Sequence, residues 1–162
     1  MRFTKVSANV WRSARFKKLD DPARLFYLFL ISNEHANSIG AYRLPDGYAL
    51  DDLGSSWTAP KLTKARDALL EAELIAFDAE AQTYFVRRWF KHSPPQNESH
   101  AQGCRRLISE LESDAIREAV EVEFEEANAQ RPSPSPLDYG IAASGSRGSD
   151  KWPVRLRANG GR

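Results

Sequence analysis

Two groups of cationic side chains have the residue types and spacing that suit contact with phosphate groups. In the first group, Lys61 and Lys64 lie three residues apart in the first turns of a helix expected over residues 58–73. A lysine at such a place can pair with a phosphate oxygen or with the edge of a guanine. Thr58, the expected N-cap, and the positive end of the helix dipole also favour an anion there. Acidic residues farther along the same helix restrict the expected contact to its N-terminal turns; the alternative is a solvated charged face.

The second group lies about twenty-five residues later in the chain, where Arg87, Arg88 and Lys91 alternate with Trp89 and Phe90. Cations in this arrangement suit contact with a nucleic-acid backbone. We expect the two aromatic residues to be core residues that close a hairpin against the first helix, with the cations outside it.

The N-terminal arm, residues 1–18, contains six basic residues and no acidic residue. Its cations could follow a phosphate strand or a minor groove, as basic arms of DNA-binding domains do. Apolar residues such as Trp11 and Phe16 are interleaved with them, which favours an arm anchored to the core or to a second copy of the chain. The arm cations that we consider candidates for DNA contact are Arg12, Arg15, Lys17 and Lys18.

Composition argues against several other kinds of chemistry. The chain of 162 residues has a formal net charge of +1, one cysteine and three histidines, without the ligand spacing of a metal site. It also lacks a phosphate-binding GxxxxGK loop, an HExxH motif and a GxSxG motif. We therefore expect a protein that is not an enzyme and that needs no cofactor, metal or disulfide. Because there is neither a long apolar run nor the apolar core of a signal peptide, we expect a cytoplasmic protein without membrane contact.

The elements that must position these cations can be predicted from local signals. A helix is expected from Asp21 as N-cap, with Pro22 in its first position, through ARLFYLFLIS. IGAYRLP is typical of a short strand, and GYALDDLG of a short helix that Gly54 ends. Thr58 begins the next helix, in which Trp57 should pack on Leu62. LIAFD and TYFVRRWF then predict a hairpin joined by AEAQ, although no Gly or Asn marks its tip.

Residues 101–128 show apolar side chains at helical spacing, and Ser113 and Asp114 divide them into two expected helices with a strongly acidic opposite face. Such an apolar stripe must pack back on the domain or meet a partner. We assign it to assembly, through Leu107, Leu111, Ile116, Val120 and Phe124.

The order of elements predicts the fold class. A helix, a strand, a short helix, a longer helix and a hairpin form an α+β winged helix-turn-helix with a short three-stranded sheet. The expected domains are a winged helix with its basic arm over 1–97, a helical extension over 101–128, and a disordered, basic tail rich in Pro, Ser and Gly over 129–162, with Trp152 as a contact point.

The stretches VWRSARFKKLDDPARLFYLFL, IGAYRLPDGYALDDLG, KARDALLEAELIAFD and WFKHSPPQN resemble the winged-helix domain of phage and prophage replication proteins of the replisome-organiser type. The resemblance spans about residues 5–97 and involves no catalytic motif. It implies a role in replication initiation in a bacterial host cell, binding to an origin or to single-stranded DNA, and recruitment of a helicase or helicase loader. The chain departs from that family in having only about thirty helical residues and a tail where relatives commonly carry a second domain.

Two other functions fit the same scaffold. A winged helix can be a protein-interaction or dimerisation module that binds a host or phage protein, and the near-neutral total charge favours this alternative. A transcriptional regulator would also use this fold. The banding of charge along the chain, with basic ends and an acidic region before the tail, favours DNA.

Overall fold

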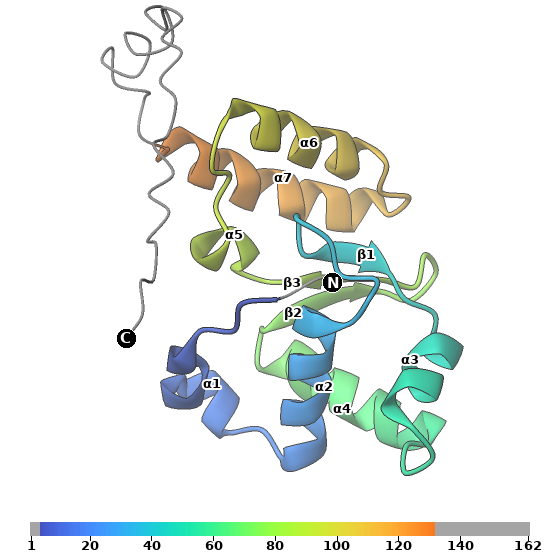
Figure 1. Cartoon of the computed structure of the whole chain (residues 1–162). Helices are drawn as coiled ribbons and strands as arrows, with labels where there is room; N and C mark the ends of the chain where they lie inside the picture. The colour runs from blue at the N-terminus through green and yellow to red at the C-terminus, as the bar shows by residue number, and fades with distance from the viewer. Residues whose placement is uncertain (1–3, 132–162) are drawn as a thin grey trace, which may run out of the picture. The chain divides into compact units, whose positions relative to one another are not determined.

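A computed structural model describes residues 4–131, which fold into an α+β unit with one small antiparallel sheet (Figure 1). The predicted disorder of the tail and the predicted contact through Trp152 lie outside the described residues. The elements, in chain order, are η1 (Ala8–Arg12), α1 (Ala14–Lys17), α2 (Asp21–Ser32), β1 (Ala41–Arg43), α3 (Asp46–Leu53), α4 (Ala59–Glu71), β2 (Ile75–Asp78), β3 (Thr83–Val86), α5 (Trp89–His92), α6 (Glu98–Ser109) and α7 (Asp114–Ala129).

Helix α2 lies at the centre of the core that it shares with α3 and α4. Its N-cap lies one residue before the one that the sequence predicts. The N-cap is Asp20 rather than Asp21, because a carboxylate oxygen of Asp20 accepts a hydrogen bond from the backbone N–H of Ala23 at 3.0 Å. Phe26 and Leu30 on this helix are fully buried. The almost continuous apolar sequence of the helix therefore reflects its central position.

The helix pair α3–α4 meets at the two residues that the sequence predicts, Gly54 and Thr58, whereas α4 ends at Glu71, two residues before the predicted end. Gly54 ends α3 with φ +84°, a left-handed conformation that glycine adopts without steric cost. Thr58 is the N-cap of α4, where its hydroxyl oxygen accepts a hydrogen bond from the N–H of Lys61 at 3.4 Å. Leu62 and Leu69 on α4 are fully buried. One face of α4 is thus fixed against the core, as its apolar spacing indicates.

The sheet has the strand order β1-β3-β2, with both neighbouring pairs antiparallel. The hairpin tip between β2 and β3 forms without Gly or Asn, because a carboxylate oxygen of Asp78 accepts hydrogen bonds from the N–H groups of Glu80 and Ala81 at 2.9 and 3.2 Å. Gln82 then takes φ +49° before β3 begins.

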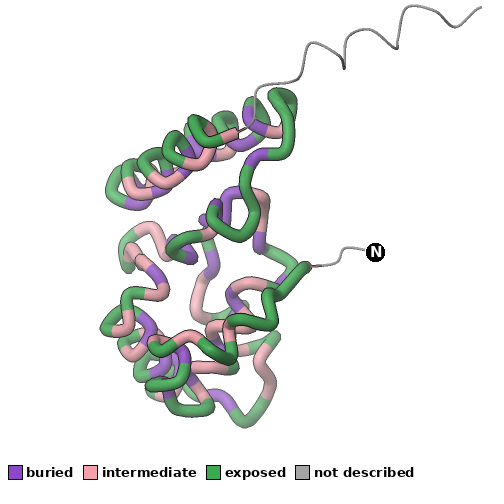
Figure 2. The backbone as a smooth tube through the Cα atoms, turned by 90° about the vertical axis from the view of Figure 1, so that its left-hand side faces the viewer, coloured by how far each residue is buried: buried purple, intermediate pink, exposed green. Residues whose placement is uncertain are grey.

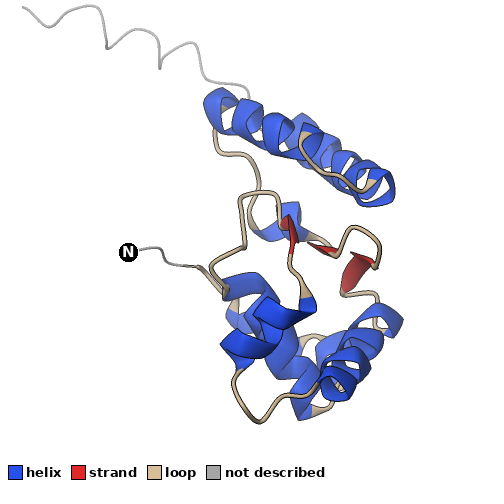
Figure 3. Ribbon diagram, turned by 90° about the vertical axis from the view of Figure 1, so that its right-hand side faces the viewer, coloured by secondary structure: helices blue, strands red, loops and turns tan. Residues whose placement is uncertain are grey.

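Strand β3 is buried on both faces, which divides the core into two layers. Tyr84 and Val86 face the layer of α2, α3 and α4, whereas Phe85 faces α6 and α7 together with Ile39 and Ala41. Figures 1 and 3 show the strands between these two groups of helices. A continuous apolar strand such as TYFV is typical of a strand covered on both sides.

Helices α6 and α7 belong to the same compact unit as the preceding elements, so the helical extension expected over 101–128 packs back on the domain, one of the two arrangements that its apolar stripe allows. Along these two helices, buried positions recur between exposed ones (Figure 2). The apolar stripe packs on the sheet because Phe85 and Ala41 offer it an apolar face. The helical region continues to Ala129, one residue beyond its expected end.

The strand predicted from TYFVRRWF ends at Val86. Arg88 takes the left-handed conformation, with φ +63° and ψ 26°, and the chain continues into the one-turn helix α5. Phe90 is buried against Phe124 of α7 instead of α2, with the two ring centroids 5.5 Å apart. Trp89 is half-buried, and its indole N–H donates to the Ser38 carbonyl at 2.8 Å. The predicted core position is confirmed for Phe90 and holds only in part for Trp89, and the partners of both differ from those expected.

A polar network joins α3, α4 and β3. The guanidinium of Arg66 donates to both carboxylate oxygens of Asp46 at 2.7 and 3.3 Å and to the Tyr84 hydroxyl at 2.8 Å. The same guanidinium lies 4.4 Å from the centroid of the Phe77 ring. Because the Arg66 side chain is only 11% exposed, this network fixes the angle at which α4 meets the hairpin.

Burial raises the pKa of Tyr84 to about 12, and this predicts a loss of stability at high pH. The unfolded chain releases the phenolic proton near pH 10, whereas the folded protein keeps it up to about pH 12, so stability is complete below pH 10 and falls as the pH rises through this window. We expect a loss of about 2–3 kcal/mol in the free energy of unfolding, measured by urea denaturation at a series of pH values. In Tyr84→Phe this component should be missing, and an unchanged pH dependence in the variant would contradict the assignment.

Candidate nucleic-acid interface

The N-terminal arm is fixed to the domain by its apolar residues and by its backbone. Phe16 is buried, and Trp11 contacts it edge to face with ring centroids 5.3 Å apart. The carbonyls of Phe16 and Lys17 accept hydrogen bonds from the Arg24 guanidinium at 3.3 and 2.8 Å. The sequence predicts that these apolar residues anchor the arm either to the core or to a second copy of the chain. The structure shows that they anchor it to the core of its own chain.

The fixed arm holds its cations at the surface. Arg12, Lys17 and Lys18 are exposed. Arg15 bonds to Glu73, just after α4, through the carboxylate at 3.3 Å and through the backbone carbonyl at 3.2 Å. Exposed ion pairs of this kind contribute little stability, so Arg15 remains able to exchange Glu73 for another anion.

The hairpin base, residues 86–92, holds the second group of cations. Arg87, Arg88 and Lys91 are exposed there. The backbone N–H of Arg88 donates to a carboxylate oxygen of Glu123 on α7 at 3.0 Å, which stabilises the left-handed conformation of Arg88. Burial raises the pKa of Glu123, and the Arg88 N–H and the nearby Arg87 partly offset this effect. The sequence had given no indication that Glu123 would hold this turn.

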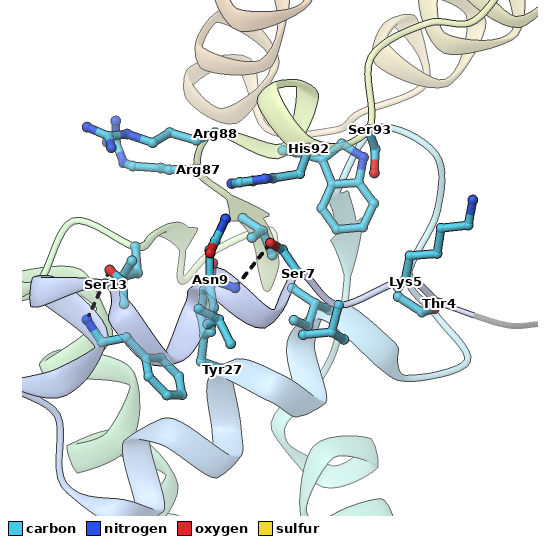
Figure 4. Close-up of a pocket in the computed structure, with 18 of the residues that line it drawn as sticks. Thr4, Lys5, Ser7, Asn9, Ser13, Tyr27, Arg87, Arg88, His92 and Ser93 are labelled. Carbon is cyan, nitrogen blue, oxygen red and sulfur yellow. Dashed lines mark hydrogen bonds between the residues drawn. The ribbon is translucent and has the colours of Figure 1, made fainter.

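A cleft of about 760 Å³ lies between the arm and the hairpin base, and we call it the arm cleft (Figure 4). Arg15, Arg87 and Arg88 all line it, so cations more than seventy residues apart in the sequence converge on one cavity. In Figure 4, Arg87 and Arg88 lie at one end and Lys5 at the other, with Asn9 and His92 between them. The arm cleft therefore unites two of the groups that the sequence had suggested separately.

Thr58, Lys61 and Lys64 are not among the residues that line the arm cleft. The Lys61 ammonium donates to the Ser56 carbonyl at 3.1 Å and lies 4.8 Å from the centroid of the Trp57 ring. The Lys64 ammonium lies 4.0 Å from a carboxylate oxygen of Asp20. Lys64 is exposed and Lys61 half-buried, so these side chains form a second, smaller cationic patch at the start of α4.

The surroundings of the two cationic groups differ in charge. Acidic residues outnumber basic ones over residues 46–71, and Asp51, Asp52, Asp67 and Glu71 are all exposed there. The hairpin tip adds Asp78 and Glu80. The arm has no acidic residue from 4 to 18. Glu73 lies beside Arg15 and Glu123 beside Arg88, but basic residues still outnumber these carboxylates at the arm and the hairpin base, so phosphate is attracted more strongly there than to the α3–α4 surface.

No protein-family model matches this chain, and neither a curated protein nor a solved structure matches it. The resemblance to phage replication proteins therefore stays a prediction.

The residues predicted to form an assembly surface lie in the interior of the described unit. Ile116, Val120 and Phe124 are at most 3% exposed, and Leu107 and Leu111 are partly buried beside them. Because these side chains pack on the sheet of their own chain, they do not offer an apolar face to a second protein. This corrects the predicted assembly surface: its apolar spacing is that of a core helix.

Several residues at this interface had no distinguishing signal in the sequence. Tyr27, His92 and His100 line the arm cleft from three separate segments of the chain. The proximity of His100, which lies on α6, to Tyr27 of α2 depends on how α6 folds back onto the domain. Ser113, which does not line the cleft, had been marked by the sequence: it is the N-cap of α7, and its hydrogen bond to Asp78 is the main cause of the lowered pKa of that carboxyl group.

Within residues 4–131, no three His, Cys, Asp or Glu side chains gather in a way that could hold a metal ion. No helix in the same range is both long enough and apolar enough to cross a membrane.

Proposed function

We propose that this protein binds nucleic acid and contacts its phosphates chiefly through a basic face made of the arm and the hairpin base. The observation that carries the proposal is the convergence of Arg15, Arg87 and Arg88 on one cleft. Phosphate contacts supply most of the affinity in such complexes, and flexible exposed cations make them at little cost. The basic face comprises Arg12, Arg15, Lys17, Lys18, Arg87, Arg88 and Lys91.

The scaffold that we propose for this contact is a winged helix, with α3 and α4 as the helix-turn-helix and β2–β3 as the wing. The order of helices and strands and the antiparallel three-stranded sheet support it. Thr58, Lys61 and Lys64 then form a secondary contact at the start of α4. The acidic hairpin tip points to a wing that contacts nucleic acid near its base and not through its tip.

The cellular process that we propose is replication initiation in a phage-infected or prophage-carrying bacterium, on the ground of the sequence resemblance. In this proposal the protein is cytoplasmic and acts by binding, without covalent chemistry, on duplex or single-stranded DNA. A helicase or a helicase loader would be its protein partner, and a homodimer would have to form through a surface other than the buried face of α6 and α7.

The proposal predicts how binding depends on salt. In Arg87→Ala/Arg88→Ala, the slope of log K against log salt concentration should be shallower than in the wild type by about 1.4–1.8, because two phosphate contacts are lost. Fluorescence anisotropy with labelled duplex and single-stranded DNA at several salt concentrations measures this slope. Lys61→Ala/Lys64→Ala should change it less, since those lysines lie among exposed carboxylates.

The matched control is Arg105→Ala/Arg106→Ala, which removes the same charge from the exposed side of α6. Its slope should equal that of the wild type apart from a small effect of net charge. Equal slopes in the wild type and in Arg87→Ala/Arg88→Ala, or no binding at low salt, would contradict the proposed interface.

A further inference from the structure

The arm cleft combines an apolar interior with a cationic rim, and phosphate contact alone does not require this combination. Tyr27 and Ile31 of α2, Val10 of the arm and the half-buried Trp89 line it beside the cations. A backbone-binding surface needs cations only, whereas an aromatic and aliphatic interior suits a planar, weakly polar group. The volume of about 760 Å³ lies in the range of small-molecule sites.

The aromatic wall of the cleft is held in place before any ligand arrives. Gly40 leaves no side chain on one side of the Trp89 ring, so the ring packs directly against the backbone there. The hydrogen bond from the Trp89 indole to the Ser38 carbonyl fixes its orientation. A preorganised aromatic surface loses little entropy when a base stacks on it.

A second aromatic side chain of the cleft, Tyr27, can supply a polar contact. A tyrosine hydroxyl is protonated at neutral pH, and burial raises the pKa of Tyr27 further, so this group can donate a hydrogen bond. Asn9, which is exposed and lines the cleft, offers an amide with both a donor and an acceptor. These are the groups that recognise the edge of a nucleobase.

We propose that the arm cleft holds one nucleotide, with its base between the arm and the side chains of Tyr27 and Trp89 and its phosphate on Arg87 and Arg88. The nucleotide could belong to a nucleic-acid strand or be a free nucleotide, because both have the same chemistry. For a nucleotide within a strand, the inference rests on the proposed function. A base can enter the cleft only when it is unpaired, so the site favours single-stranded over duplex nucleic acid.

The test blocks the cleft without removing any charge. Asn9→Trp places a bulky ring at an exposed position that lines the cleft, and Ala8→Trp places the same ring on the neighbouring exposed residue of η1, which does not line it. Each variant is compared with the wild type by anisotropy, on a short labelled oligothymidylate and on an abasic strand of equal length. Thermal unfolding of both variants checks that they fold.

The wild type and Ala8→Trp should bind the base-bearing strand about tenfold more tightly than the abasic strand, whereas Asn9→Trp should bind the two strands equally. Equal binding of both strands by the wild type would overturn the nucleotide site and leave phosphate binding intact. The same preference in Asn9→Trp as in the wild type would also overturn it.

A calorimetric titration with thymidine monophosphate distinguishes a free nucleotide from a nucleotide within a strand. It also separates failure of the nucleotide site from failure of the proposed nucleic-acid binding. If no strand binds at low salt, the proposed function fails. The nucleotide site then stands only if the monophosphate binds to the wild type and to Ala8→Trp but not to Asn9→Trp, and it fails if the monophosphate does not bind. A base preference in the strands without monophosphate binding assigns the site to a nucleotide within a strand.

Discussion

Phe124→Ala should lower the free energy of unfolding by about 3–5 kcal/mol, the range typical of removing a buried phenylalanine. Phe124 is only 1% exposed and packs against Phe90. The Arg105 guanidinium covers the ring at 5.4 Å from its centroid. Truncation leaves a cavity between α6, α7 and the sheet that the surrounding elements cannot fill. Urea denaturation followed by circular dichroism measures the change.

The same helix supplies the control. Val122 on α7 is 56% exposed, and Val122→Ala should change stability by less than about 0.5 kcal/mol. A loss below about 1 kcal/mol for Phe124→Ala, together with weaker self-association in sedimentation, would mean that α7 serves an interface between chains. A large loss of stability in a monomeric protein would support the intramolecular packing described above.

Gly40→Ala should destabilise the protein by about 2–5 kcal/mol. Gly40 has φ +65°, where a residue with a Cβ atom is disfavoured by about 1–2 kcal/mol. An added methyl group would also overlap the Trp89 ring, and overpacking of this kind costs about 1–3 kcal/mol. Thermal and urea unfolding give the change, and near-ultraviolet circular dichroism shows whether Trp89 has moved.

Gly47→Ala is the matched comparison, because Gly47 lies inside α3 and no heavy atom comes within 4 Å of its added methyl group. This substitution should stabilise the protein by up to about 1 kcal/mol through better helix propensity. If Gly40→Ala were as harmless as Gly47→Ala, the close packing of Trp89 on Gly40 would be wrong. In a Trp89→Ala background, the steric part of the Gly40→Ala effect should disappear.

The elements that the sequence predicted well are those with local signals. Thr58 and Gly54 mark helix ends by hydrogen bonding and by backbone conformation, and both act within a few residues of chain. The hairpin followed from its two apolar runs, although its tip depends on Asp78, a residue that the prediction passed over. These helix ends and the hairpin were predictable because hydrogen bonds and backbone conformations within a few residues determine them, and distant contacts do not change them.

The parts that were predicted wrongly depend on distant contacts. Arg88 leaves the strand because Glu123, thirty-five residues away, accepts its backbone N–H, and nothing near Arg88 indicates that partner. The apolar spacing of α7 is the same for a helix that packs on its own sheet and for one that meets a partner. The continuous TYFV run of β3 was the available signal, since a strand with one solvent-exposed face alternates apolar and polar residues.

The candidate site was also predictable where local signals determine it and unpredictable where distant contacts do. The cationic residues could be recognised by type, but the convergence of Arg15 with Arg87 and Arg88 requires the arm to fold along α2 and the hairpin to end at α5. The charge of the α3–α4 surface could be counted from the sequence. The positions of the two cationic groups in the fold were needed to show that these acidic residues surround Lys61 and Lys64 and not the arm.

The burial of β3 on both faces has a consequence for cooperativity. One strand supplies Tyr84 to the layer of α2 and α4 and Phe85 to the layer of α6 and α7, so neither layer can lose its contacts without exposing the other side of the same strand. The two layers should therefore unfold as one unit, and the amide protons of β3 should exchange with solvent only through global opening. The hairpin base, joined to this strand, then keeps its arginines in place even while surface segments fluctuate.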